Sequence, residues 1–319
     1  MSNPRFSILI PVFNQVGKMD ACIESVKAQT FRDFEVILVD DGSTDGSDEM
    51  LKEFAKGDDR FKIFTHETNR SLLRARFTGM KNAVGERVIF LDSDDVLASD
   101  LLYDLNEHLK ENDTEVVRYG FILEPSKYEI LPPDDMEPFE ALARFKFPTA
   151  IMSACFALPV IKKAVELIDP PYVNSSEDTL MSGVLLNTCN TYSNMKKAYY
   201  HYTMTGGMSR ETDTLTMDKL DKTLESIHNC TDCFMDFIKK HHPEKIDLAR
   251  MAITNIYKFE MAHYVLNTKD EKKAVDYLNI INNDDFPEAF DFGCREVLTE
   301  FFKRKLTDYE GNRRAFFGF

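Results

Sequence analysis

The sequence predicts an α/β fold in which a mostly parallel sheet is flanked by helices and followed by a helical C-terminal appendage. The first observation is that short apolar runs alternate with helix-patterned segments over residues 6–120. Strands separated by helical segments of this length form right-handed βαβ units, which assemble into parallel sheets. The second observation is that the pattern after about residue 213 is helical only, with Leu220, Leu224 and Ile227 spaced along one face.

Each element follows from its local pattern. The opening run Phe6–Phe13 is rich in β-branched and aromatic residues, which indicates a strand. The next segment carries apolar residues at positions 19, 22, 23 and 26, the spacing of a helix face. Turn and cap residues over 40–47 separate the second strand from the second helix. The predicted strands are 6–13, 34–39, 61–65, 87–91 and 115–119, and the predicted helices are 18–29, 47–56, 71–84 and 99–111. Prolines interrupt the segment 121–200, where we expect loops and short strands.

The composition is that of a globular chain longer than one typical domain. Its 319 residues are 43% hydrophobic and include 25 Phe, enough for a large core. The net charge of −15 argues against nucleic acid or a broad anionic membrane surface as the partner. The sequence has no 18-residue apolar run and no signal-peptide pattern at its start, so we expect a soluble, cytoplasmic protein.

The distribution of the cysteines also fits a cytoplasmic protein. Six of them are scattered along the chain, as expected for a reduced, cytoplasmic protein. Cys230 and Cys233 have the spacing of zinc ligands, but no second pair of matching spacing accompanies them. We therefore favour thiols carried on a helix over a metal site.

Polar residues gather where the predicted strands end. Asn14 follows the first strand, Asp40 and Asp41 follow the second, and the run 92–95 with three acids follows the fourth. Ligands of parallel α/β sheets bind at this carboxyl edge. Carboxylates so close together repel one another, and the absence of nearby His or Cys favours a hard divalent cation as their partner. The alternative is that Asp95 or Ser99 only caps the following helix.

Together these residues resemble family 2 glycosyltransferases of the GT-A (Rossmann-like) fold. The matching segments are 8–14, 25–31, 39–45 and 90–95. The likeness covers residues 6–100 and returns over 175–210. It implies an enzyme that moves a sugar from a nucleotide diphosphate donor, usually a UDP-sugar, to an acceptor.

The resemblance also implies which residues bind the donor nucleotide. Pro11 and Phe13 would wall the base, and Asp41 would accept a hydrogen bond from its imide N–H, unless it serves only as an Asx-turn residue. Arg76 would hold a uracil carbonyl or a phosphate. Its rival is Arg74, and a solvated helix face remains the alternative for both. The family motif around Arg76 is incomplete, because positions 71 and 77 depart from it.

The acid run resembles the family's metal site. Asp92 and Ser93 would contact the donor, Asp92 through the ribose or a metal-bound water, and Asp94 would ligate Mn²⁺ or Mg²⁺ directly. The ion would bridge the two phosphates as a Lewis acid. His201 could complete the metal shell, although a His at such a position is more often a packed strand residue.

The acceptor side is implied by a second acidic pair. Asp178 resembles the family's catalytic base, which takes the proton of the acceptor hydroxyl, and Glu177 would orient the acceptor. The structural alternative is that both acids only favour the positive end of a helix. Residues 198–209 resemble a Tyr-rich strand and Gly-rich loop that close the site, with Tyr202 near the place where many relatives carry Arg.

The predicted organisation is a GT-A domain over 1–210, with a nucleotide-binding half (1–120) and an acceptor half (121–210), followed by a helical region (211–319). The sequence has no Trp, so it lacks the Gln-x-x-Arg-Trp signature of processive synthases. We therefore expect one sugar per encounter, added to a saccharide or lipid-linked acceptor of a bacterial surface polysaccharide.

Two other functions remain open at this point. A nucleotidyltransferase on a similar sheet would need a Gly-rich phosphate loop, of which residues 14–18 are a poor version. A non-catalytic nucleotide-binding module would not need Asp92, Asp94 and Asp178, so the presence of these acids counts against it. A further prediction is a peripheral contact with the inner face of a membrane, made through the aromatic and basic segments 301–305 and 313–317. The simpler expectation is that the Phe side chains of these segments dock on the core.

Overall fold

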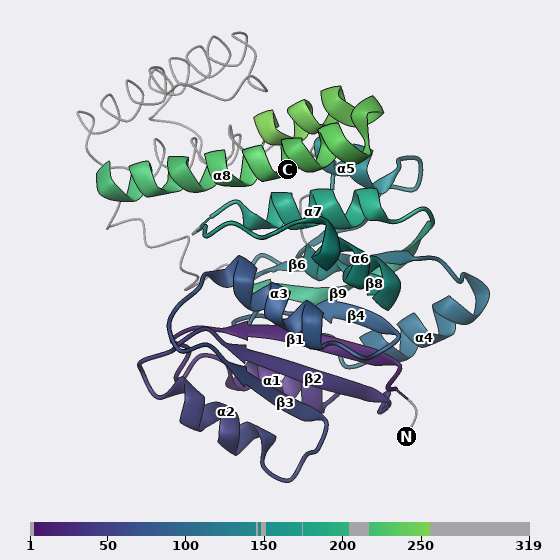
Figure 1. Cartoon of the computed structure of the whole chain (residues 1–319). Coiled ribbons are helices and arrows are strands. Elements are labelled where there is room, and N and C mark those ends of the chain that lie inside the picture. Colours follow the sequence, from purple (N-terminus) through teal and green to yellow (C-terminus); the bar gives the residue numbers. More distant parts are fainter. Residues whose placement is uncertain (1–2, 145, 148–150, 174, 204–216, 256–319) are drawn as a thin grey trace, which may run out of the picture.

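The structure of the protein, a computed structural model, describes residues 3–144, 146–147, 151–173, 175–203 and 217–255 (Figure 1). Its first four strands are parallel to one another. β1 (Phe6–Val12) lies between β2 (Phe34–Asp40) and β4 (Arg87–Phe90), and β3 (Phe61–Thr65) pairs with β2. They are connected by α1 (Asp20–Lys27), α2 (Ser47–Ala55) and α3 (Leu72–Asn82), close to the predicted ranges.

The second part of the sheet mixes both strand directions. β8 (Ala154–Ala157) runs antiparallel between β4 and β6 (Val116–Glu124), and β6 is parallel to β9 (Tyr192–Thr203). Two short strands, β5 (Val96–Leu97) and β7 (Tyr128–Ile130), pair antiparallel with β9 and β6. The helices of this part are α4 (Leu101–Glu111), α5 (Pro138–Ala143), α6 (Leu158–Leu167) and α7 (Glu177–Thr188), with a 3₁₀ turn η1 at Ile151–Ser153. The strand order is β3-β2-β1-β4-β8-β6-β9-β5.

Helices cover both faces of this sheet, which confirms the predicted α/β class. All seven residues of β1 are buried, as expected for a parallel strand with no solvated face. Its side chains alternate between two apolar clusters: Ile8 and Ile10 pack with α1 and α4, whereas Leu9 packs with α3 and α7. This two-sided burial holds the strand ends rigidly, and the candidate site lies at those ends.

The helix α8 (Met217–His241) belongs to the predicted C-terminal helical region and lies across α7 (Figure 1). The contact is close at Gly183 of α7, where an added Cβ would come within 2.4 Å of the Phe234 ring. Phe234 also meets Phe139 of α5 edge-on, at 6.0 Å between ring centroids. Helix α8 therefore shares one apolar cluster with the sheet and with α7.

Several predictions fall partly or wholly outside the described residues. The boundary at residue 210, the Gly-rich loop after Thr203 and the aromatic and basic segments beyond 300 all lie there. Of the described helices, none combines the length and apolar character that crossing a bilayer requires. Cys230 and Cys233 both lie on α8 as free thiols, in agreement with the prediction.

Candidate active site

The acids predicted to form a site lie at the carboxyl edge of the parallel strands. Asp41 directly follows β2, whose last residue, Asp40, pairs with Val12 at the end of β1. Asp92 follows β4 after one intervening residue. The predicted convergence of the strand ends is therefore present in the fold.

Arg76 of α3 is the centre of the acid cluster. Its side chain is only 2% exposed. Nη2 donates to Oδ1 of Asp92 at 2.8 Å, and Nη1 donates to Oδ1 of Asp178 at 2.5 Å. Nη1 also lies 3.4 Å from Oε1 of Glu177. One guanidinium thus joins the loop after β4 to the first turn of α7. The acids of that turn lie about a hundred residues after Arg76 in the sequence.

Burial and charge together set the protonation equilibria of this cluster. Burial disfavours a charged guanidinium, but the three carboxylates outweigh burial and raise the pKa of Arg76. Burial, aided by the charge of Asp178, raises the pKa of Glu177 to about 7. Burial likewise raises the pKa of Asp178, although the positive charge of Arg76 opposes this shift. Three carboxyl groups thus face one guanidinium, and the cluster carries excess negative charge when all three are ionised.

Strand β9 fixes the loop that carries the remaining acids. The buried Asp95 carboxylate accepts hydrogen bonds from the Tyr200 hydroxyl and the Thr203 backbone N–H, both at 2.6 Å. The Tyr200 hydroxyl in turn accepts the backbone N–H of Asp92 at 3.2 Å. Burial and the charge of Asp92 raise the pKa of Asp95 to about 7. The alternative that Asp95 only caps a helix is wrong, because its carboxylate binds β9 and Asp100 is the residue that precedes α4.

The two predicted metal ligands are Asp94, in the loop that carries Asp95, and His201, which follows Tyr200 in strand β9. Asp94 is partly exposed in the turn between β4 and β5, and the neighbouring Ser93 is buried. His201 of β9 pairs with Val96 of β5, and its Nδ1 lies 3.0 Å from Oε1 of Glu124. In the part of the chain that the structure describes, no group of three or more His, Cys, Asp or Glu side chains is arranged to hold a metal.

The residues predicted to bind the nucleobase of the donor lie at the ends of β1 and β2. Pro11 is buried in β1, and Phe13, just past the end of the strand, is partly exposed. The buried Asp41 uses one oxygen, Oδ1, to bind both Nδ1 of His66 at 2.6 Å and the backbone N–H of Arg70 at 2.9 Å. Its carboxylate is thus held from two directions.

The Asx-turn alternative applies to Asp40 rather than to Asp41. Oδ1 of Asp40 accepts the backbone N–H of Ser43 at 3.0 Å. Gly42 between them has a φ of +73°, and an added Cβ would lie 2.5 Å from the carbonyl carbon of Thr68. Asp40 and Gly42 build the turn, whereas the carboxylate of Asp41 contacts residues 66 and 70.

His66 is a site residue that the sequence interpretation missed. It directly follows β3, so its ring lies at the same carboxyl edge as the acids. Its second ring nitrogen, Nε2, lies 2.8 Å from Oγ1 of Thr78 on α3. The rule that located Asp41 and Asp92, a polar residue directly after a parallel strand, would have found His66 as well. Of the two arginines compared on α3, Arg76 lies among the acids and Arg74 is partly exposed.

A doubly covered α/β sheet with an acid cluster at its carboxyl edge defines a nucleotide-dependent transferase domain of the GT-A type. The family model for glycosyl transferase family 2 matches residues 7–166, and the chain belongs to this family. The nucleotidyltransferase alternative is thereby set aside.

The relatives agree with this assignment. The chain is 35% identical over 141 residues to the uncharacterized glycosyltransferase EpsJ of Bacillus subtilis, covering 44% of this chain and 41% of the relative. It is 33% identical over 138 residues to the glycosyltransferase GlyA of Streptococcus pneumoniae, covering 39% of this chain and 20% of the relative. The chain thus spans less than half the length of these curated relatives.

Solved structures share the fold. The S. aureus TarS fragment 1–349 in complex with UDP-GlcNAc superposes with a TM-score of 0.69 at 18% identity, covering 96% of this chain and 89% of that chain. The mannosyltransferase PcManGT of Pyrobaculum calidifontis, in complex with GDP-Man and Mn²⁺, gives a TM-score of 0.53 at 13% identity, covering 95% and 81%. At these identities the likeness establishes the fold, and the GT-A prediction is confirmed.

Proposed function

We propose that this chain is an inverting, metal-dependent glycosyltransferase that moves one sugar from a UDP-sugar to a saccharide or lipid-linked acceptor. The observation that carries the proposal is the bridge made by Arg76 between Asp92 and Asp178. This bridge brings the proposed donor side and the proposed base into one cluster. The glycosyltransferase relatives and the UDP-GlcNAc complex of TarS support a nucleotide-sugar donor, and a role in bacterial surface polysaccharide synthesis stays a prediction.

The residues present fit a divalent cation. Carboxylate oxygens are the ligands that Mn²⁺ and Mg²⁺ accept, and Mg²⁺ is typically held by one or two carboxylates together with substrate phosphates. The three acids around Arg76 show that carboxylate oxygens gather at this edge of the sheet, which agrees with that mode. Asp94 would be the direct ligand. His201 is a candidate second ligand through Nε2, because metal-bound His usually bonds a carboxylate with its other nitrogen, as Nδ1 does here with Glu124.

When bound, the ion would supply Lewis-acid stabilisation of the diphosphate leaving group. The protein's own groups would hold the donor. Pro11 and Phe13 would wall the base, and Asp41, fixed by His66, would accept its imide N–H. Asp92 and the backbone around Ser93 would lie against the ribose side of the donor.

Asp178 would act as the base. Its carboxylate would take the proton of an acceptor hydroxyl while that oxygen forms a bond to the anomeric carbon and the bond from this carbon to the diphosphate oxygen breaks. Attack from the face opposite the leaving group inverts the anomeric centre. The Asp178 side chain is 36% exposed, so an acceptor can reach it, and its raised pKa makes the carboxylate a better proton acceptor. Glu177, on the same turn, would orient the acceptor.

The division of the chain remains part of this proposal: a GT-A domain over 1–210, with a nucleotide half to 120 and an acceptor half beyond it, and a helical region over 211–319. The cytoplasmic location and the membrane contact of the C-terminal segment also remain predictions.

The test is a panel of UDP-, GDP- and dTDP-sugars, with Mn²⁺ or with EDTA, in which released nucleotide is measured. We expect metal-dependent release from a UDP-sugar, and Asp178→Asn should lower transfer by roughly 10²–10⁴-fold while UDP binding persists. Asp59→Asn, at an exposed acid in the loop before β3, is the matched control and should have no effect. A protein that does not bind UDP with Mn²⁺ would contradict the proposed donor. Undiminished transfer by Asp178→Asn would contradict the proposed base.

A further inference from the structure

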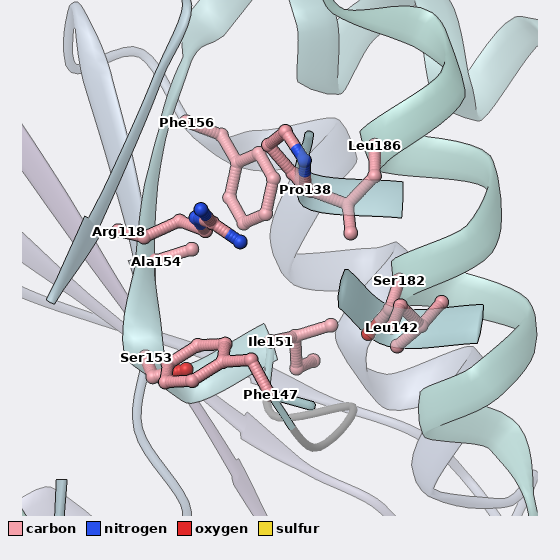
Figure 2. Close-up of a pocket in the computed structure, with 10 residues that line it drawn as sticks. All are labelled: Arg118, Pro138, Leu142, Phe147, Ile151, Ser153, Ala154, Phe156, Ser182 and Leu186. Atoms are coloured by element: carbon pink, nitrogen blue, oxygen red, sulfur yellow. The ribbon is translucent and has the colours of Figure 1, made fainter. Parts of the chain in front are cut away.

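A buried arginine outside the acid cluster faces a small cavity between the sheet and two helices. Arg118 of β6 is 2% exposed and lies on the face of the sheet that α5 and α7 cover. Figure 2 shows its guanidinium at the wall of this cavity, next to Phe156 and turned toward Pro138. This residue has no part in the proposed transfer reaction.

Only part of the Arg118 guanidinium is satisfied by the protein. Nε donates to Oδ1 of Asn194 at 2.8 Å, and Nη2 donates to the carbonyl oxygens of Pro133 at 3.0 Å and Met136 at 3.2 Å. Nη1 is buried and has no acceptor among the described residues. Burying a guanidinium N–H group costs free energy unless the group donates to an acceptor. Nη1 therefore lacks a hydrogen-bond acceptor that its burial requires.

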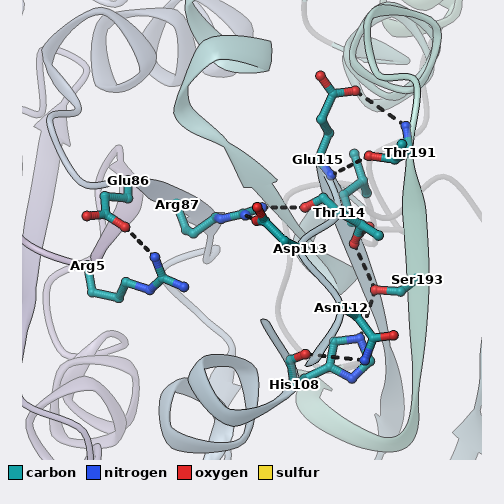
Figure 3. A network of polar contacts seen from close by, with 11 residues as sticks. Arg5, Glu86, Arg87, His108, Asn112, Asp113, Thr114, Glu115, Thr191 and Ser193 are labelled. Carbon is teal, nitrogen blue, oxygen red and sulfur yellow. Dashed lines mark hydrogen bonds and ion pairs between the residues drawn. The ribbon is translucent and has the colours of Figure 1, made fainter. Parts of the chain in front are cut away.

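Arg118 also makes no direct ion pair among the described residues, although the charge of Glu137 and the rings of Phe147 and Tyr192 attract it more weakly. No carboxylate of the described residues lies within 4.0 Å of its nitrogens, whereas the buried Arg76 faces three acids. The buried Arg87 donates to the carboxylate of Asp113 at 2.8 Å (Figure 3). Burial lowers the pKa of Arg118 from its ordinary value, because desolvation outweighs the attraction of the more distant Glu137. An arginine nevertheless stays protonated in proteins, so the positive charge persists.

The cavity has the size of a small ion. It leaves about 20 Å³ for the centre of a water-sized particle, enough for one or two such particles. Besides Arg118, its lining includes the two serines Ser153 and Ser182 among apolar side chains. An oxyanion such as sulfate or phosphate needs more room, and a cation would be repelled by the guanidinium.

We propose that this cavity binds a monatomic anion of the chloride class at Nη1 of Arg118. The anion would accept the hydrogen bond that the protein leaves unmade and neutralise the charge that no described carboxylate contacts. Ser182 lies on α7, four residues after Asp178, so a bound anion would tie β6 to the helix that carries the acidic pair. The site depends only on the fold and is independent of the sugar transfer.

The direct test is crystallographic. Crystals of the full-length protein grown or soaked in NaBr should show an anomalous peak within hydrogen-bond distance of Nη1. A water oxygen at that position, with no anomalous signal, would overturn the proposal. This measurement uses the wild-type protein and does not depend on whether any variant folds.

The second test is thermal unfolding of the full-length protein at constant ionic strength, with NaCl replaced by sodium gluconate, an anion too large for the cavity. At about ten times its Kd, chloride should raise Tm by roughly 2 °C, and the effect should saturate. Arg118→Met should abolish this chloride response. Arg87→Met is the matched control: it should lower Tm but keep the response. Equal Tm values in chloride and gluconate for the wild-type protein would contradict an anion site.

Discussion

Replacing Arg76 by Met should destabilise the protein in a manner that depends strongly on pH. The substitution keeps the aliphatic volume but removes the cation that contacts Asp92, Glu177 and Asp178. Breaking a buried ionic cluster by removing one partner typically costs about 3–5 kcal/mol. Asp92 and Asp178 retain side-chain exposures of 24% and 36%, so water can relieve part of the cost. We therefore expect about 3 kcal/mol at alkaline pH, a fall in Tm of roughly 4–5 °C.

The sign of the pH dependence follows from the carboxyl groups that Arg76 leaves behind. In the wild-type protein the pKa of Glu177 is already about 7, and loss of the cation should raise it further. A carboxyl group whose pKa is higher in the folded than in the unfolded state favours folding most when protonated. Its contribution is complete below the unfolded pKa and is lost as the pH rises through the folded pKa. The destabilisation by Arg76→Met should therefore be small near pH 5 and should grow as the pH rises above about 7, so that it is large near pH 9.

The assay is urea unfolding in EDTA at both pH values, with Arg74→Met as the matched control. Arg74 lies on the same helix but is partly exposed, and its substitution should change stability by less than about 0.5 kcal/mol at either pH. Arg76→Lys, which keeps the charge but cannot contact the acids on two sides at once, should fall between the variants. An equal loss for Arg76→Met at both pH values, or a loss no greater than that of Arg74→Met, would refute the argument.

Three further predictions concern other contacts. His66→Asn should weaken UDP binding about tenfold, because Asp41 loses one of its two hydrogen-bond donors, while kcat should change little. Calorimetry measures the Kd for UDP, and kinetics at a saturating nucleotide-sugar concentration measure kcat. An unchanged Kd would contradict the role of His66. Tyr200→Phe should cost about 1–3 kcal/mol in urea unfolding because the buried Asp95 loses a donor, and an unaltered midpoint would show that this bond is dispensable. Gly183→Ala should cost about 1–3 kcal/mol because its Cβ overlaps the Phe234 ring, and an unchanged Tm would mean that α7 and α8 separate freely.

The sequence was sufficient for the parallel half of the fold and for the acids at its edge. The strands at Phe6, Phe34 and Arg87 are apolar runs bounded by turn residues, and their pattern is local. Because parallel strands end at one edge, the acids that follow them could be placed together without knowledge of any side-chain contact.

The mixed half could not be predicted in the same way. The two-residue strand β5 forms only because β9, about a hundred residues later, lies beside it. The insertion of β8 between β4 and β6 likewise depends on pairings that leave no periodic signal in the sequence. For the site, the resemblance assigned Arg76 to the donor, and nothing in the sequence indicated that its guanidinium would lie against Asp178. The roles proposed for the individual site residues stay predictions.

The close contact between Gly183 and Phe234 bears on how this chain can be recombined with its relatives. A chimera that exchanges the C-terminal region near residue 210 would remove α8 from the helix it packs against and expose one side of α7. A junction after residue 255 would keep α7 and α8 from the same parent protein, so that Gly183 and Phe234 remain a matched pair. Relatives that carry a larger residue at the position of Gly183 would need a smaller one facing it, so these two positions should be exchanged together.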